Sequence, residues 1–172
     1  MYPMNALVSD QVSRLRRLIG DPDHRFVKIF RETCGNGVRR PQFGMYTGRT
    51  PYAGPEPRKD ADHRLENTYS KMIHPETDEG EDFLRQLTKE GKIPSKENFD
   101  AFLEKLHNSK HIPDAEDAEL VTRFEMQQFC PDILITNYSM LEYMLLRPRE
   151  KKIWDDTKRW LESDPKNKLL FV

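Results

Sequence analysis

Residues 131–145, PDILITNYSMLEYML, decide the fold of this chain. The Ile-rich run 132–136 is short, apolar and bounded by Pro131 and Asn137, which predicts a buried strand. Apolar residues then recur at helical spacing at Met140, Leu141, Met144 and Leu145. A buried strand that leads directly into a helix is typical of a parallel sheet, because parallel strands need long crossover connections. We therefore expect an α/β protein.

The first third of the chain shows the same alternation of helices and strands. A first helix is predicted from apolar residues at helical spacing, which are Val8, Val12, Leu15 and Ile19. Asn5 is its expected N-cap and Gly20 its expected end. A second helix is expected over residues 25–34, and a short strand over residues 42–46. That strand ends at a turn signal, Thr47–Gly48.

The middle of the chain is predicted to be a helical insertion. Residues 51–60, PYAGPEPRKD, carry three prolines and one glycine and are expected to form a loop at a boundary. Residues 61–129 are interpreted as helical throughout, with apolar stripes within 83–87, 99–106 and 120–129. The expected parts are therefore an α/β unit made of residues 1–52 and 129–172, interrupted by an insertion at residues 53–128.

The C-terminal part returns to the α/β pattern. A helix is expected around Ile153 and Trp160, and Pro165 breaks it. The apolar run 169–172, LLFV, is predicted to be another buried strand. Because the chain stops within its most apolar run, we expect an internal piece of a longer protein. The expected fold class is α/β, a partial three-layer parallel sheet with a mainly helical insertion.

The charges are balanced overall but unevenly distributed. The chain has 28 Lys or Arg against 29 Asp or Glu. Residues 1–59 hold eleven basic against five acidic residues, whereas residues 76–119 hold six against thirteen. This pattern suits phosphate binding by the first stretch and an outward-facing role for the second. Two ordinary solvated faces remain the alternative interpretation.

Composition also limits the class of protein. Cys34 and Cys130 belong to no Cys-x-x-Cys pair, so neither a disulfide framework nor a zinc site is expected. The five histidines are scattered, and no metal-ligand set is apparent. No stretch approaches about 18 apolar residues, and the first ten residues lack the features of a signal peptide. We therefore expect a cytoplasmic protein with no membrane partner.

Four segments resemble the motifs of superfamily 2 helicases of the DEAD/DEAH type. YPMNALVSDQ (2–11) resembles motif Ia, and MYTGRTPY (45–52) is similar to a following Tyr-Thr-Gly segment. PDILITNYSMLEYML resembles the next motif, and LLFV resembles the strand before the acidic motif II. The segments occur in the family's order. The resemblance implies an internal fragment of the first RecA-like domain, from motif Ia to the strand before motif II.

In that family these segments contact the sugar–phosphate backbone of the tracked strand. Carried over, the contact residues are Met4, Asn5, Thr47, Gly48, Arg49, Thr136, Asn137 and Tyr138. Hydroxyls, amides, backbone N–H groups and one arginine suit phosphate contact without base reading. The alternative is that Thr136 and Asn137 only cap the following helix. The implied partners are a nucleic-acid backbone, with DNA expected rather than RNA, and the remainder of the helicase.

The sequence lacks the parts that bind ATP. None of its eight glycines lies in a Gly-x-x-x-x-Gly-Lys phosphate loop, and there is no Asp-Glu-x-His motif. No catalytic residue, metal site or cofactor site is therefore predicted in this chain, which is expected to be inactive alone. ATP and Mg²⁺ are implied only for the complete helicase. The alternative function is a truncated, stand-alone helical module that binds a protein partner.

Overall fold

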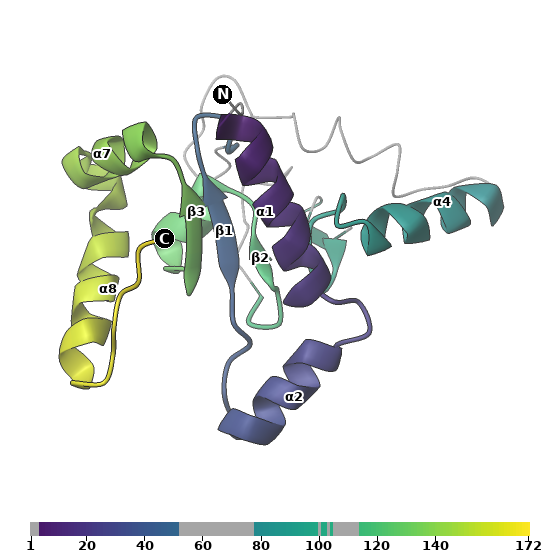
Figure 1. Ribbon diagram of the computed structural model, residues 1–172, viewed down its shortest axis with the longest axis horizontal. Helices are drawn as coiled ribbons and strands as arrows, with labels where there is room; N and C mark the ends of the chain where they lie inside the picture. The colour runs from purple at the N-terminus through teal and green to yellow at the C-terminus, as the bar shows by residue number, and fades with distance from the viewer. Residues whose placement is uncertain (1–3, 52–77, 100, 103, 105–113) are drawn as a thin grey trace.

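The computed structural model describes residues 4–51, 78–99, 101, 102, 104 and 114–172, although the side chains of residues 4, 5 and 78–81 lie outside this description. The helices are α1 (Met4–Leu18), α2 (Arg25–Cys34), α4 (Asp78–Lys89), α6 (Arg123–Gln128), α7 (Tyr138–Leu146) and α8 (Lys151–Ser163), with a 3₁₀ turn at Pro148–Glu150 before α8. The strands are β1 (Phe43–Tyr46), β2 (Glu119–Leu120) and β3 (Ile133–Thr136). The protein is therefore a mixed α/β structure (Figure 1).

The three strands form one parallel sheet in the order β2-β1-β3. Phe43 of β1 lies opposite Glu119 of β2, and Tyr46 of β1 lies opposite Thr136 of β3. Because all three strands run in one direction, their carboxyl ends lie at the same edge of the sheet. The predicted parallel α/β architecture is thus confirmed.

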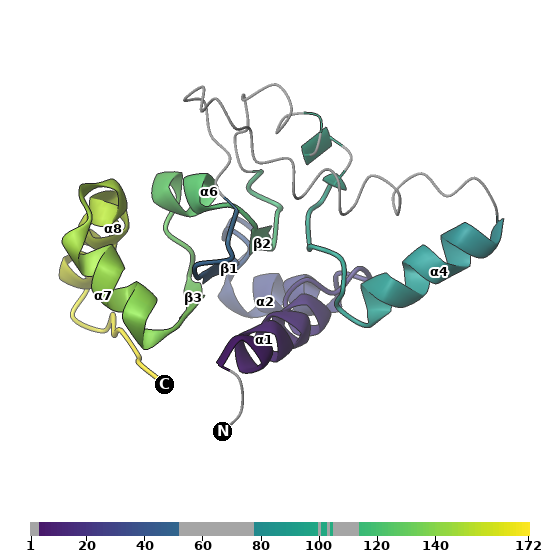
Figure 2. The same ribbon diagram turned by 90° about the horizontal axis from the view of Figure 1, so that it is seen from above.

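Helices cover both faces of this sheet. Successive residues of a strand point to opposite faces, so Phe43 and Tyr46 belong to separate cores. One core joins Phe43 to residues of α1, Val12 among them; the other joins Tyr46 to Met126 of α6 and Met144 of α7. Figure 2 shows α1 on one side of the strands and α6 on the other. The result is a helix–sheet–helix arrangement in three layers.

The close approach of α6 to the sheet depends on Gly44 in the middle of β1. A Cβ atom at this position would lie 2.5 Å from Met126 Sδ and 3.2 Å from the carbonyl oxygen of Leu120. Only glycine leaves room for both neighbours.

A capping box holds the start of α6. The buried Thr122 side chain accepts a hydrogen bond from the Glu125 N–H, and the Glu125 carboxylate accepts one from the Thr122 N–H.

A group of buried, charged side chains lies in and beside β2. The Glu119 carboxylate accepts two hydrogen bonds from the Arg16 guanidinium, each 2.7 Å long. Lys96 is enclosed between Asp117 and Glu125, with its Nζ 3.0 Å from Asp117 and also paired with Glu125. These ion pairs connect α1, β2, α6 and the segment before residue 100.

Most predicted elements are confirmed, and three details are wrong. Residues 119–120 form a strand, although the stretch 61–129 was expected to be helical throughout. Glu119 gives no local signal of a buried strand, because this charged residue is buried only through its ion pair with Arg16, which is distant in the sequence. Asn5 is the second residue of α1 and not its N-cap. The predicted strand at residues 169–172 is the third detail that is wrong.

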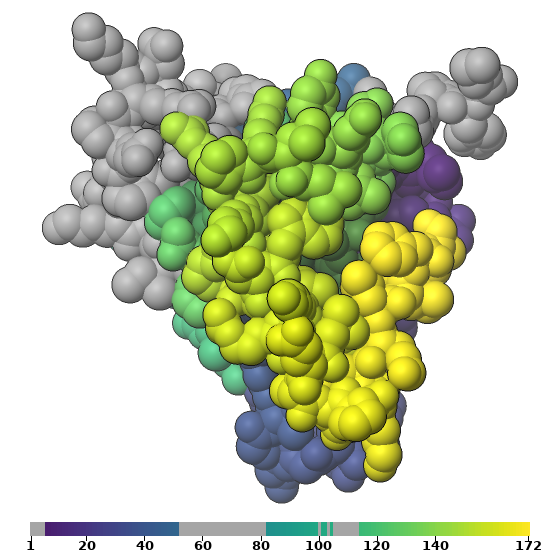
Figure 3. Space-filling view, turned by 90° about the vertical axis from the view of Figure 1, so that its left-hand side faces the viewer, coloured from purple at the N-terminus to yellow at the C-terminus, as the bar shows by residue number. Residues whose placement is uncertain are grey.

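Residues 169–172 do not form the predicted strand, and they are exposed. Leu170 is 81% exposed and Phe171 is 71% exposed. Figure 3 shows this terminal segment, in yellow, at the surface beside α8. A strand forms only where its backbone groups pair with a neighbouring strand, and within the described part of the chain none pairs with this segment. The predicted boundary at residue 53 lies outside the described residues, and the one at residue 128 falls at the last residue of α6; both boundaries remain predictions. None of the described helices is long and apolar enough to cross a membrane.

Candidate nucleic-acid interface

The carboxyl ends of β1 and β3 bring two of the predicted contact segments together. Tyr46 and Thr136 are register partners at the last position of each strand. The Thr136 hydroxyl donates a hydrogen bond of 2.7 Å to the Tyr46 carbonyl oxygen, which joins the two strand ends directly. The first turn of α1 lies at the same edge (Figure 1). We call the turn 47–50, residues 136–138 and the first turn of α1 the carboxyl edge.

The turn 47–50 is held together by two buried threonines. The Thr50 hydroxyl donates to the Met45 carbonyl oxygen at 2.6 Å and accepts from the Thr47 N–H at 2.9 Å. The Thr47 hydroxyl in turn accepts from the Arg49 N–H at 3.2 Å. Thr47 is only 2% exposed. The structure therefore places Thr47 as a residue that shapes the turn, with its N–H and carbonyl groups already bonded within the protein.

Gly48 and Arg49 form the exposed tip of this turn. A Cβ atom on Gly48 would meet nothing within 4 Å, so the surface above it is open. The Arg49 guanidinium makes no hydrogen bond or ion pair with any other residue that the structure describes. An exposed guanidinium without a carboxylate partner is available to an anion. Arg49 is thus the predicted contact residue whose chemistry is most accessible.

Asn137 caps α7, as one of the two interpretations of the sequence expected. Its side-chain oxygen accepts a hydrogen bond of 2.9 Å from the Met140 N–H. Tyr138 follows as the first residue of α7 and is 77% exposed. Capping uses only the oxygen of the Asn137 amide, so it leaves the NH₂ group to serve as a donor. Phosphate contact by Thr136, Asn137 and Tyr138 remains a prediction.

Met4 and Asn5 are the first two residues of α1, and their side chains lie outside the described residues. The backbone at this end of α1 nevertheless matters. The first N–H groups of a helix have no partner within the helix, and the helix dipole places partial positive charge there. Both α1 and α7 therefore direct such ends to the carboxyl edge.

Four residues behind the carboxyl edge were missed by the sequence analysis. The Arg123 guanidinium donates a hydrogen bond of 2.7 Å to the Thr47 carbonyl oxygen and lies 5.4 Å from the centre of the Tyr46 ring. The Tyr46 hydroxyl donates to Glu150 Oε1 at 2.6 Å and accepts from Gln127 Nε2 at 3.0 Å. Burial, followed by the Glu150 hydrogen bond, raises the pKa of Tyr46 well above its usual value. No local motif marks Arg123, Gln127 or Glu150, because their partners are distant in the sequence; Tyr46 lies in the MYTGRTPY segment but was not among the predicted contact residues.

Comparison with known proteins finds a relative along the whole of this chain. The chain is similar to Druantia protein DruE. The two sequences are 41% identical over an alignment of 200 residues, and DruE comes from Escherichia coli (strain UMEA 4076-1). The alignment covers 100% of this chain but 10% of DruE, so the chain spans about a tenth of the length of this relative. No protein-family model matches the chain, and no solved structure matches it.

The similarity to DruE includes every segment of the carboxyl edge, because it extends along the whole chain.

The contribution of the α7 cap to stability can be tested separately from any binding. Replacing Asn137 with alanine removes the hydrogen bond to the Met140 N–H, and we expect a loss of about 1 kcal/mol in the free energy of unfolding. Replacing Asn137 with aspartate keeps a good cap, so stability should stay close to that of the unchanged protein.

Urea unfolding followed by circular dichroism measures this difference. A matched control is Asn36→Ala, since Asn36 is exposed and its side chain forms no hydrogen bond with any residue that the structure describes. If Asn137→Ala and Asn137→Asp lost equal stability, the cap would not explain the role of Asn137.

Proposed function

We propose that the chain is a segment of the first motor domain of an ATP-dependent superfamily 2 helicase, in which the carboxyl edge binds the sugar–phosphate backbone of nucleic acid. The observation that carries this proposal is the pairing of β1 with β3. This pairing joins the ends of two segments that resemble successive helicase motifs, and a third such segment begins α1 nearby. In open α/β sheets, ligands bind outside the carboxyl ends of the strands.

The chemistry of the carboxyl edge suits phosphate groups. Arg49 supplies an exposed cation, and the Asn137 amide and Tyr138 hydroxyl supply hydrogen-bond donors. The N-terminal ends of α1 and α7 add the partial positive charge of the helix dipole. Donors of these kinds bind the backbone without reading the bases. We accordingly expect binding with little sequence preference, and with DNA favoured over RNA.

In the complete helicase, this chain would bind nucleic acid, whereas the rest of the longer protein would bind ATP and Mg²⁺. The resemblance implies that ATP and Mg²⁺ bind to a phosphate loop and an acidic motif, neither of which is present in these 172 residues. The chain would form part of a RecA-like domain together with the segments that carry those motifs. Residues 53–128 would be an insertion specific to this kind of helicase.

The alternative, a separate helical interaction module, is less well supported. Residues of the predicted insertion 53–128 contribute to the core of the sheet itself: Ala118 belongs to the core beneath α1, and Leu120 to the core beneath α6. β2 also pairs with β1. A stretch that completes the sheet is poorly suited to act as an independent module.

Replacing Arg49 with alanine tests the proposed interface. We expect affinity for single-stranded oligonucleotides to fall roughly fivefold, which corresponds to about 1 kcal/mol for one exposed charged contact. The loss should be similar for oligonucleotides of different sequence. The slope of log K against log salt should become shallower by about 0.7, because one phosphate fewer is neutralised on a single strand. Fluorescence anisotropy with labelled DNA and RNA at several salt concentrations measures all three quantities.

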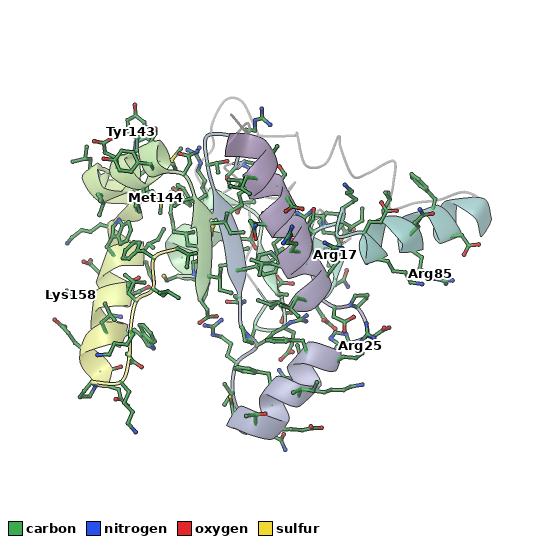
Figure 4. The ribbon with its side chains drawn as sticks, viewed as in Figure 1. Arg17, Arg25, Arg85, Tyr143, Met144 and Lys158 are labelled. Carbon is green, nitrogen blue, oxygen red and sulfur yellow. The ribbon has the colours of Figure 1, made fainter. Side chains whose placement is uncertain are left out.

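Arg159→Ala is the matched control for this experiment. Arg159 is an exposed arginine of α8 that is already paired with Asp156 at 3.2 Å. Its neighbour Lys158 lies on α8, below the labelled Tyr143 of α7 in Figure 4. Arg159→Ala should leave affinity and salt slope nearly unchanged. Equal effects of the two substitutions would contradict the proposed interface, and so would the absence of binding by the unchanged chain.

A further inference from the structure

We infer that Arg123 is a positioning residue of the carboxyl edge, which holds the turn 47–50 in place without itself contacting phosphate. This inference rests on the proposed function for its consequence in binding. The structural part, that Arg123 orders the turn, can be tested without any nucleic acid. Arg123 lies at the start of α6, far from the turn in the sequence.

Arg123 bonds to both sides of the turn. Its side-chain Nη2 donates to the Thr47 carbonyl oxygen at 2.7 Å, and its backbone N–H donates to the Pro51 carbonyl oxygen at 2.9 Å. The two acceptors precede and follow the exposed residues Gly48 and Arg49. One residue therefore anchors both ends of the segment that carries the exposed cation.

Arg123 is itself held in place by its neighbours. Arg123 is the first residue of α6, immediately after the fully buried N-cap Thr122, whose capping box with Glu125 orders this helix end. The guanidinium lies over the Tyr46 ring at 5.4 Å, within the range of a cation–π interaction. Its Nε is buried and has no hydrogen-bond partner among the described residues, so this side of the guanidinium faces the protein interior.

A second layer of contacts supports the Tyr46 ring. Its hydroxyl bonds to Glu150 at 2.6 Å and to Gln127 at 3.0 Å. Glu150 is 2% exposed, and its other carboxylate oxygen has no partner within the part of the chain that the structure describes. A buried carboxylate with a single hydrogen bond depends strongly on that bond. The ring is consequently held from β1, from α6 and from the turn before α8, and Arg123 rests on this ring.

This arrangement separates the roles of two arginines. Arg49 is exposed and would neutralise a phosphate, so its loss should change both the affinity and the salt slope. Arg123 has its Nη2 bonded to Thr47 and its Nε buried, so its loss should lower affinity through disorder of the turn. Counterion release, and with it the salt slope, should then stay unchanged.

Amide hydrogen exchange in the unliganded chain provides the first test. In Arg123→Ala, the amides of Thr47, Arg49 and Thr50 should exchange at least roughly tenfold faster, because a charge-assisted hydrogen bond to the turn is lost. Arg123→Lys, which keeps a cation able to reach the Thr47 carbonyl, should restore part of the protection. Arg49→Ala should not change the exchange of the Thr47 and Thr50 amides. Unchanged turn amides in Arg123→Ala would overturn the inference, whatever the binding data.

Oligonucleotide binding with the same variants provides the second test. Arg123→Ala should weaken binding roughly threefold to tenfold at an unchanged salt slope, while Arg49→Ala should make the slope shallower. A slope that falls as much in Arg123→Ala as in Arg49→Ala would show direct phosphate contact and would overturn the positioning role. If Arg123→Ala reduces the folded fraction, Arg123→Lys supplies the same comparison. If the turn loosens but no variant binds nucleic acid, the proposed function fails and the anchoring of the turn stands.

Discussion

Replacing Lys96 with alanine is expected to destabilise the protein by about 3–5 kcal/mol, the range typical of removing one partner from a buried ion pair. The Lys96 side chain is fully buried, as is that of Glu125, and the Asp117 side chain is 5% exposed. Removing the cation takes the positive charge of Lys96 away from two buried carboxylates. Lys96 Nζ also lies 4.5 Å from the centre of the Phe102 ring, so a cation–π contact is lost as well.

The size of this effect follows from where the ion pair sits. Glu125 forms the capping box of α6, and Asp117 accepts hydrogen bonds from the N–H groups of Glu97 and Asp114. Both carboxylates are therefore held in place by the backbone and cannot turn outward to water. The remaining hydrogen bonds to these carboxylates favour the lower part of the expected range.

Urea or thermal unfolding of Lys96→Ala measures the loss, with Lys92→Ala as the matched control. Lys92 belongs to the same segment but is exposed, so its substitution should change stability by no more than about 0.5 kcal/mol. The double variant Lys96→Ala with Glu125→Gln should lose less than the sum of the two single losses, because both substitutions remove the same Lys96–Glu125 ion pair. Additive losses, or a Lys96→Ala variant as stable as Lys92→Ala, would show that the three charges are not coupled.

Replacing Gly91 with alanine is expected to cost about 2–5 kcal/mol, from two separate effects. Gly91 has a φ of +70°, in the left-handed region, where a side chain costs about 1–2 kcal/mol. A Cβ atom here would also lie 2.4 Å from the Ser13 carbonyl oxygen of α1, and such overpacking typically costs about 1–3 kcal/mol. The backbone of α1 would have to move, together with the hydrogen bond of 3.2 Å from Arg16 to the Gly91 carbonyl oxygen.

Gly37→Ala is the control for this prediction. A Cβ atom at Gly37 would meet nothing within 4 Å, and its φ lies outside the left-handed region. Alanine there should be neutral or slightly stabilising, since it restricts the unfolded chain. Urea unfolding of Gly91→Ala and Gly37→Ala gives the midpoints to compare. Equal midpoints would mean that α1 and the segment after α4 are not in the close contact described.

The main strands and helices could be predicted because their signals are local. In residues 131–145 the apolar run, the asparagine cap and the helical spacing all lie within a few residues of one another, and β3 and α7 follow them closely. The same holds for α2, β1 and α8. Local spacing also placed Arg49 and Asn137 at strand ends, where the structure has them.

The contacts that complete the sheet could not be predicted. β2 has two residues, one of them charged, and Glu119 is buried only because Arg16 of α1 neutralises it. Residues 169–172 show the opposite error: their composition predicts a strand, but no neighbouring strand in the described part pairs with them. Strand formation depends on hydrogen-bond partners that lie elsewhere in the chain.

By itself, the sequence determined most of the helices, the strands β1 and β3, and the residues that follow these two strands, because period and capping chemistry act over one or two turns of chain. Only the tertiary structure decided which of those residues are available at the surface. Thr47 and Thr136 use their hydroxyl groups within the protein, whereas Arg49 and Tyr138 remain exposed. It also decided that Arg123, Tyr46 and Glu150 support the turn. Such contacts join residues far apart in the sequence, and they arise only when the packing of helices on the sheet brings the residues together.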